Sequence, residues 1–199
     1  MRLYINTTSP FVRIVRIALA EKGLAEGVEL VNVDPWADPE PFLAANPAGR
    51  VPVLVTEDGT AIAESLLILR WLDERVAAPA VFPADGLAAT LDRAGIALAA
   101  MEASTAIIIG RKSNPDFDTH MVGARRYRTI AQAFGRLDAL PPRDLADRVD
   151  IANIAAVTLI DYVLMRYTDR DWLGPVPTLA AWHARQRDRP SLVATRPYV

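Results

Sequence analysis

Hydrophobic positions in the first 76 residues follow two different spacings. Short runs rich in β-branched or other apolar residues predict strands at 3–5, 28–33, 53–55 and 61–63. An Asp-Gly pair between the last two runs favours a tight hairpin turn. Two stretches repeat apolar side chains every three or four positions, which predicts helices at 11–22 and 65–76. The predicted order is β-α-β, a loop with a short helix near 39–45, and then β-β-α.

The rest of the chain has helical spacing only. A connector punctuated by proline and glycine occupies residues 77–86. Four later stretches fit helices, at 87–110, 119–140, 150–167 and 177–187. The predicted fold class is therefore α/β plus all-α. A thioredoxin-like domain spans residues 1–76, the linker spans 77–86, and a helical-bundle domain spans 87–199.

Composition and charge exclude several classes of protein. Hydrophobic residues make up 51% of the 199 positions, which is too many for a disordered chain. The 22 basic and 24 acidic residues give a net charge of −2, so no bulk attraction to nucleic acid or an anionic membrane follows. No signal peptide is evident, and Glu102 and Asp161 interrupt the two most apolar runs. We expect a cytoplasmic protein without a membrane span.

The chain has no cysteine. This excludes disulfides, cysteine-ligated zinc, iron–sulfur clusters and a cysteine nucleophile. Its two histidines, His120 and His183, lie far apart in the sequence and are expected to serve packing or the surface, so no metal site is expected. Any thiol chemistry must use a sulfur that a ligand brings.

Three stretches of the first half carry candidate chemistry, and each also has a plainer structural interpretation. Ser9 precedes a proline at a helix start, where it either caps the helix only or also faces a bound anion. Pro52 marks the start of a strand, and a cis bond after Val51 can turn the Val51 backbone toward an extended peptide ligand. Glu64 and Ser65 join a strand to a helix, so they can cap it or hold the ammonium and carboxylate groups of a ligand.

Together these stretches resemble the glutathione S-transferase family, and the resemblance covers nearly the whole chain. The segments TTSPFVRIVRIALAEKGL, NPAGRVPVLV and AESLLILRWLDE are similar to the family's glutathione-site motifs in order and spacing. The helical half adds two matches, at 150–153 and at 177–191. The family usually has Ser or Thr in place of Asp150 and Asp in place of Asn153. Asp and Asn can serve the same capping roles, so the local fold is expected to persist.

The resemblance implies a bacterial-type, serine-dependent glutathione transferase that joins the glutathione thiolate to a small, hydrophobic electrophile. Ser9 would donate a hydrogen bond to the glutathione sulfur, with Thr8 as the alternative hydroxyl. The residues implied in glutathione binding are Phe11, Arg50, Val51, Pro52, Glu64 and Ser65. Val51 would pair with the cysteinyl backbone beside a cis proline. Arg50 would lie near the glycyl carboxylate, and Glu64 would face the γ-glutamyl amine.

The same resemblance places the second substrate between Ser9 and the predicted helix 87–110. The residues implied there are Met101, Thr105, Ile108 and Arg111. The first three are small or apolar, which suits a hydrophobic electrophile, but core packing explains them equally well. Glutathione is a co-substrate in this interpretation, no further cofactor is expected, and the protein is expected to be a homodimer.

Two alternative functions stay open. The same fold can carry a glutathione-dependent isomerase, dehalogenase or peroxidase, although residues 7–11 lack the serine-rich signature of maleylacetoacetate isomerases. It can also serve as a non-catalytic binding or scaffold protein, against which the presence of Ser9 and Glu64 argues. A basic cluster at 125–128 is expected to be a solvated helix face or subunit contact rather than a nucleic-acid site.

Overall fold

The computed structural model describes residues 1–197, which form two compact units. The first unit contains Met1–Phe82 together with the segment that begins at Asp188, and the second contains Pro83–Arg187. The sequence pattern grouped all of 87–199 with the helical part. The last segment instead packs with the first unit.

A four-stranded mixed sheet organises the first unit, with the strand order β2-β1-β3-β4. The strands are β1 (Arg2–Ile5), β2 (Glu29–Asn32), β3 (Val53–Val55) and β4 (Ala61–Ala63). β1 is parallel to β2 and antiparallel to β3, which pairs antiparallel with β4. The Asp-Gly turn joins β3 to β4, as its sequence predicts, and the Thr56 hydroxyl donates to Asp58 within that turn at 2.5 Å.

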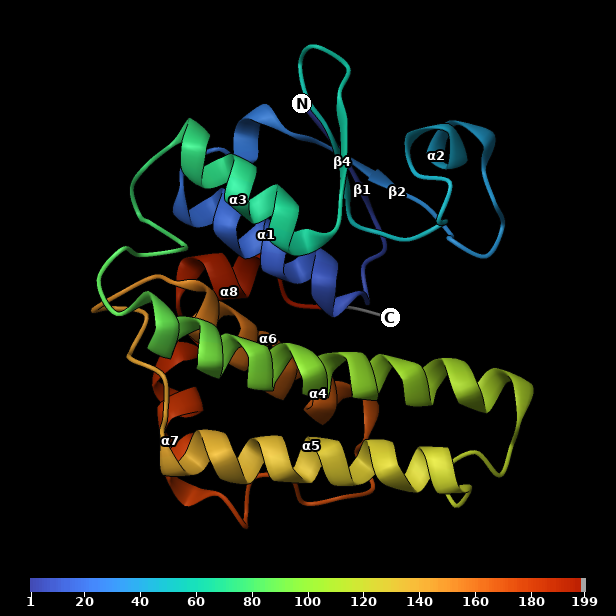
Figure 1. Cartoon of the computed structure of the whole chain (residues 1–199), viewed down its shortest axis with the longest axis vertical. Coiled ribbons are helices and arrows are strands. Elements are labelled where there is room, and N and C mark those ends of the chain that lie inside the picture. Colours follow the sequence, from blue (N-terminus) through green and yellow to red (C-terminus); the bar gives the residue numbers. More distant parts are fainter. Residues whose placement is uncertain (198–199) are drawn as a thin grey trace. The chain divides into compact units, whose positions relative to one another are not determined.

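Helices α1 (Pro10–Glu21) and α3 (Ser65–Arg75) pack against each other beside the sheet (Figure 1). The short helix η1 (Ala25–Gly27) precedes β2, and α2 (Glu40–Ala45) lies in the connection from β2 to β3. The buried stripe of α1 consists of Val12, Ile14, Val15, Ile17, Ala18 and Leu19. These buried positions recur every three or four residues, which is the helical spacing that the sequence shows. The arrangement is thioredoxin-like, as predicted.

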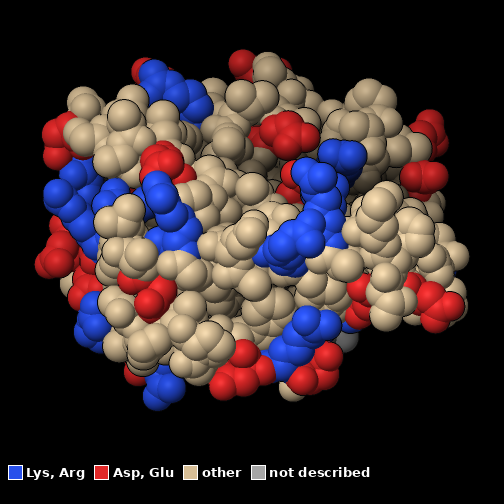
Figure 2. All heavy atoms as spheres, turned by 60° about the horizontal axis from the view of Figure 1, so that its bottom comes forward, with Lys and Arg blue, Asp and Glu red and all other residues tan. Residues whose placement is uncertain are grey.

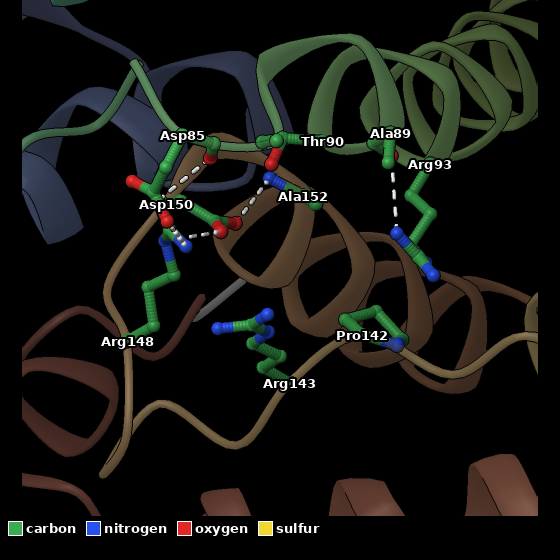
Figure 3. Close-up of a pocket in the computed structure, with 10 residues that line it drawn as sticks. Asp85, Ala89, Thr90, Arg93, Pro142, Arg143, Arg148, Asp150 and Ala152 are labelled. Atoms are coloured by element: carbon green, nitrogen blue, oxygen red, sulfur yellow. Dashed lines mark hydrogen bonds and ion pairs between the residues drawn. The ribbon is translucent and has the colours of Figure 1, made fainter. Parts of the chain in front are cut away.

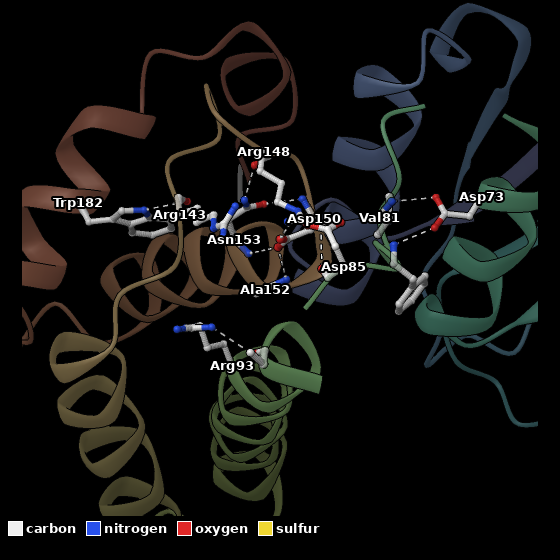
Figure 4. A network of polar contacts seen from close by, with 12 residues as sticks. Asp73, Val81, Asp85, Arg93, Arg143, Arg148, Asp150, Ala152, Asn153 and Trp182 are labelled. Carbon is white, nitrogen blue, oxygen red and sulfur yellow. Dashed lines mark hydrogen bonds and ion pairs between the residues drawn. The ribbon is translucent and has the colours of Figure 1, made fainter. Parts of the chain in front are cut away.

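A buried lysine fixes the connector that leaves α3. Lys22 Nζ donates to the carbonyl oxygens of Val76 and Pro79, at 2.6 and 2.7 Å, and lies 2.8 Å from Asp73 Oδ1. Asp73 in turn accepts two backbone N–H groups further along the connector (Figure 4). Since both charged side chains are almost completely buried, removing either one would leave an uncompensated charge, which costs about 3–5 kcal/mol.

Hydrogen bonds tie the C-terminal segment to α1. Arg189 donates to both oxygens of the Glu21 carboxylate, at 2.6 and 2.7 Å, and Ser191 donates a further bond to it. Arg13 of α1 donates to a backbone carbonyl of α8 (Pro190–Ala194) at 3.4 Å. Burial by itself would raise the pKa of Glu21, but the bonds from Arg189 and Ser191 hold it below its ordinary value.

Four helices build the second unit: α4 (Leu87–Ser113), α5 (Met121–Ala139), α6 (Ile151–Arg166) and α7 (Pro177–Gln186). α4 and α5 run side by side, and α6 packs against α4 and α7 (Figure 1). Almost every side chain of α6 is buried. These bounds agree with the four predicted helices to within a few residues, so the helical bundle is confirmed.

α4 is long and apolar enough, by length and composition, to cross a bilayer. Glu102 interrupts the apolar run, as noted from the sequence, and it is an exposed residue within this helix of 27 residues. It packs along both α5 and α6, which are its partners in the bundle.

Asp150 caps α6 as its place in the sequence predicts. Its Oδ1 accepts the backbone N–H groups of Ala152 and Asn153, at 2.9 and 3.2 Å, and Asn153 Oδ1 accepts the N–H of Asp150 at 2.9 Å. This reciprocal pair is a capping box. The departure from the family's usual residues therefore leaves the local structure intact.

Candidate active site

The register of the sheet brings the three sequence stretches to one end of it. Tyr4 of β1 pairs with Val53 of β3, which pairs with Ala63 of β4. Because adjacent strands lie about 4.8 Å apart, the three strands span only about 10 Å. Three segments therefore lie close together at this end of the sheet: 6–9 follows β1, 50–52 precedes β3 and 64–65 follows β4.

Ser9 is the N-cap of α1. Its Oγ accepts the N–H of Val12 at 3.3 Å, and Pro10 follows it as the first helical residue. The Ser9 hydroxyl proton is donated to none of residues 1–197, and the side chain is partly exposed. The first turn of α1 holds no acidic residue, so no side chain there offsets the positive end of the helix dipole. The capping interpretation is confirmed, and the hydroxyl proton is still available to an anion at this helix end.

Thr8, the other candidate hydroxyl, is differently placed. Its Oγ1–H donates to Asn6 Oδ1 at 2.8 Å, and its backbone N–H donates to the same oxygen at 3.1 Å. Asn6 in turn donates to the carbonyl oxygen of Val33, just after β2, at 3.5 Å. The Thr8 proton is thus held by the loop that follows β1.

The Val51–Pro52 peptide bond is cis, as the family resemblance implies. The loop before it is fixed by Asn46, whose Nδ2 donates to the Arg50 carbonyl at 2.8 Å. The backbone N–H and C=O of Val51 make no hydrogen bond with the described residues. The Arg50 side chain is exposed. An extended ligand can therefore pair with the Val51 backbone.

Glu64 joins β4 directly to α3 with φ 70° and ψ 125°. For a residue with a Cβ this left-handed conformation is strained by about 1–3 kcal/mol, and such strain clusters at ligand sites. Its side chain is exposed, whereas Ser65 is 5% exposed. Ser65 is the first helical residue and not the N-cap, so the prediction that it caps α3 is wrong. No side chain caps α3, so its first N–H groups are open to a carboxylate.

Phe11 lies in the first turn of α1 and is partly exposed. The α4 residues of the implied second-substrate pocket have different environments. Met101 is fully buried. The Thr105 hydroxyl bonds back to the carbonyls of Met101 and Glu102, at 3.2 and 2.9 Å, and Ile108 is partly buried.

Arg111, the fourth residue of that set, is held by an ion pair. Its Nε and Nη2 donate to Asp118 at 2.8 and 2.6 Å, and Nη2 also donates to the Tyr127 hydroxyl at 2.6 Å. Burial, together with the hydrogen bond to Asp118, raises the pKa of Tyr127 to about 12. These contacts join the end of α4 to α5. Arg111 therefore has a structural role that its place in the sequence does not predict.

The histidines and the basic cluster take structural positions in the second unit. His120 Nδ1 accepts the N–H of Val122 at 3.4 Å and caps α5, while His183 Nε2 lies 2.6 Å from Asp161. Of the cluster at 125–128, Arg126 faces Glu102 at 3.6 Å. Figure 2 shows basic and acidic side chains interspersed over one face. Among residues 1–197, no group of three or more acidic or histidine side chains is arranged to hold a metal ion.

Known proteins are similar in sequence to this chain, including the residues at this end of the sheet. Residues 8–75 match the sequence model of the glutathione S-transferase N-terminal domain. The chain is 30% identical to the uncharacterized GST-like protein YibF of Escherichia coli (strain K12), over 99% of this chain and 98% of that protein. The residues matched by the family model include Ser9 and the segments 50–52 and 64–65.

Two solved structures are similar over the whole chain. One is a glutathione S-transferase of Methylobacterium radiotolerans in complex with glutathione sulfonate, with a TM-score of 0.89, 32% identity and coverage of 100% of this chain and 95% of that one. The other is a glutathione transferase family member of Pseudomonas fluorescens Pf-5 with bound glutathione, with a TM-score of 0.87, 29% identity and coverage of 100% and 99%.

Proposed function

The chain belongs to the glutathione S-transferase family, and from that premise we propose that it is a glutathione transferase. It binds glutathione at the end of the sheet in the first unit and joins the glutathione thiolate to a small, hydrophobic electrophile. The similar structures with glutathione or its sulfonate support the choice of co-substrate. The observation that carries the reaction is the Ser9 hydroxyl, which caps α1 through its oxygen while its proton remains available.

The charges of glutathione are complementary to the groups at this end of the sheet. The tripeptide carries one ammonium and two carboxylate groups. The open N-terminus of α3 and the Ser65 hydroxyl suit the γ-glutamyl carboxylate, and the exposed Glu64 carboxylate suits the neighbouring ammonium group. The Val51 backbone suits the cysteinyl unit, and the Arg50 guanidinium suits the glycyl carboxylate. Phe11 would pack beside the ligand.

Ser9 and its helix suffice energetically to ionise the glutathione thiol. A free thiol has a pKa of about 8.5, so only a few per cent is thiolate at neutral pH. Lowering that pKa by about two units requires roughly 2.7 kcal/mol. A hydrogen bond to a charged acceptor contributes about 1.5–3 kcal/mol, and a helix N-terminus contributes about 0.3–1 kcal/mol. The reaction therefore requires no separate general base.

Calorimetry and a substrate panel test the proposed activity. We expect saturable binding of glutathione, followed by conjugation of at least one apolar electrophile from a panel that also contains halides, hydroperoxides and an isomerisable substrate. Turnover confined to the last three classes would favour an isomerase, dehalogenase or peroxidase. If no binding is detected at millimolar glutathione, the chain is a scaffold protein and the proposal fails.

We further propose that the protein works as a homodimer. Two adjacent large apolar side chains are exposed on α3, where Leu66 is 39% and Leu67 is 61% exposed. Exposed apolar patches commonly mark protein interfaces. Sedimentation velocity is expected to give twice the chain mass, and a monomer at micromolar concentration would contradict the proposal.

A further inference from the structure

We propose that the helical unit has a second ligand site, a pocket between the starts of α4 and α6 that binds phosphate or the phosphoryl group of a small molecule. The pocket has a volume of about 180 Å³. Its polar lining includes Thr90, Arg93, Arg143, Arg148, Asp85 and Asp150 (Figure 3). All of these residues belong to the second unit, so the site is separate from the glutathione site proposed above.

Two arginines of the pocket have N–H donors without an acceptor in the described part of the chain. The guanidinium of Arg143 donates a hydrogen bond to none of residues 1–197, although Arg143 lines the pocket (Figure 3). Arg93 donates from Nη1 to the Ala89 carbonyl at 3.2 Å and from Nε to the Leu140 carbonyl at 3.4 Å. Its Nη2 has no acceptor among these residues. Neither arginine forms an ion pair within the described part of the chain.

Thr90 provides an independent hydrogen-bonding group for a ligand in the pocket. The residue is only 7% exposed and lines the pocket, yet its hydroxyl bonds to none of the described residues. A helical threonine commonly donates to the carbonyl four residues earlier, as Thr105 and Thr129 do here. The Thr90 hydroxyl oxygen is not fully enclosed, so it is open to the pocket that the residue lines. A ligand oxygen in the pocket would satisfy the Thr90 hydroxyl.

The start of α4 adds to the positive character of the pocket. Gly86, the N-cap, has φ 68° and offers no side chain, and the first turn contains no acidic residue. The first N–H groups of this 27-residue helix therefore have no side-chain cap. Such a helix end favours an anion.

The two acidic residues of the pocket are already paired. Arg148 donates to both oxygens of Asp85, at 2.8 and 2.6 Å, and its Nε lies 3.5 Å from Asp150 (Figure 4). Asp150 also caps α6. Three arginines against two aspartates leave a charge of +1, which resides on the side formed by Arg93 and Arg143.

The small volume of the pocket and the number of its hydrogen-bond donors favour a phosphoryl group as the ligand. Pockets for drug-sized ligands measure about 300–1,000 Å³, so this smaller one suits a compact group. A phosphoryl group offers three strong acceptor oxygens, which can engage Arg143, Arg93 and the Thr90 hydroxyl together. A phosphoryl group also carries a charge of about −1.5 to −2 at pH 7, against −1 for a carboxylate, so the two guanidinium groups attract it more strongly.

Titration with inorganic phosphate tests the site. The full chain is first saturated with glutathione, which occupies the helix ends of the first unit, and ionic strength is held constant with chloride. We expect saturable binding of one phosphate per chain by calorimetry. Arg143→Gln is expected to weaken that binding about tenfold or more, since it removes a charge-assisted hydrogen bond. Arg93→Gln and Thr90→Val should weaken it as well.

Arg128→Gln is the matched control, because Arg128 is an exposed arginine of α5 outside the pocket. It should leave the phosphate affinity unchanged. Equal affinities in the Arg143 and Arg128 variants, or no saturable binding at all, would overturn the proposal. Tighter binding of acetate than of phosphate would overturn the assignment of a phosphoryl ligand. Since Arg143 is exposed, its variant is expected to fold, and glutathione binding in the same sample reports separately on the first unit.

Discussion

Ser9 and Thr8 are adjacent residues whose hydroxyl groups differ in their hydrogen bonds. The Thr8 proton is donated to Asn6, whereas the Ser9 proton is donated to none of the described residues. Sequence patterns identify both hydroxyls beside a helix start, but they cannot select between them. The selection depends on where the Asn6 side chain lies, and residue type alone does not determine that.

Thr8→Val tests this distinction on the Thr8 side. The variant keeps the shape of the side chain and removes the hydrogen bond to Asn6, so the free energy of unfolding should fall by about 0.5–1.5 kcal/mol. Urea denaturation measures that loss. The pKa of bound glutathione should stay unchanged, and a rise in that pKa would indicate that Thr8 contacts the sulfur.

Glu64 shows a conformation that its residue type does not predict. With Glu64 at φ 70° as the N-cap, α3 begins one residue earlier than a Ser65 cap would allow, and for this reason the sequence-based capping prediction fails. The Glu64 side chain itself is exposed at this turn. Strain and charge can therefore be tested separately.

Two substitutions at Glu64 separate those contributions. Glu64→Gly should relieve backbone strain of about 1–3 kcal/mol, partly offset by about 0.4–1 kcal/mol because glycine makes the unfolded chain more flexible. Glu64→Gln should leave stability within about 0.5 kcal/mol of the parent. Both should weaken glutathione binding in calorimetry. If Glu64→Gln binds as tightly as the parent, the carboxylate does not contact the ligand ammonium group.

At the level of elements, hydrophobic spacing predicts most of the structure. The strands, α1, α3 and the four long helices all lie close to where the periodicity places them. α1 buries a continuous apolar stripe, whereas the edge strands β2 and β4 have no fully buried residue. Ion pairs across loops are not visible in this way. Arg111 and Asp118 are seven residues apart on either side of the turn after α4, a spacing that no helical pattern distinguishes.

The capping box of α6 gives a prediction at this scale. Asp150→Ala should lower the free energy of unfolding by about 1–2 kcal/mol, since two N–H groups of the first turn lose their acceptor. Asp150→Ser should retain most of the stability, because serine is also a good N-cap. Asp147→Ala is the exposed control in urea denaturation. Equal losses in the alanine and serine variants would show that capping is not the source.

At the scale of the whole molecule, the return of the C-terminal segment to the first unit was not predictable. Arg189 and Glu21 are 168 positions apart, and each would be an ordinary surface charge in a local pattern. Their pairing depends on the path of the chain between them. The family resemblance, by contrast, correctly indicated the thioredoxin-like and helical parts, because its motifs cover nearly the whole length.

The Glu21 contact predicts a pH-dependent contribution to stability. Its pKa in the folded chain lies below 4.5, so the contribution is complete above about pH 4.5 and disappears as the pH falls through the lower, folded-state pKa. At pH 7, Glu21→Gln should be less stable than the parent by about 1–3 kcal/mol. Thermal unfolding of both chains at several pH values measures the difference, which should shrink in acid. A difference independent of pH would contradict the ion-pair account.

The chain has no cysteine, and in the proposed function glutathione supplies the reactive sulfur, so the ionisation of that bound thiol is the central claim. The most direct measurement is a pH titration of the thiolate ultraviolet absorbance of bound glutathione, in the parent chain and in Ser9→Ala. We predict that the variant still binds glutathione, while the pKa of its thiol rises by about one to two units toward the free value of about 8.5. An unchanged pKa in Ser9→Ala would contradict the assignment of Ser9 as the hydroxyl that activates the sulfur.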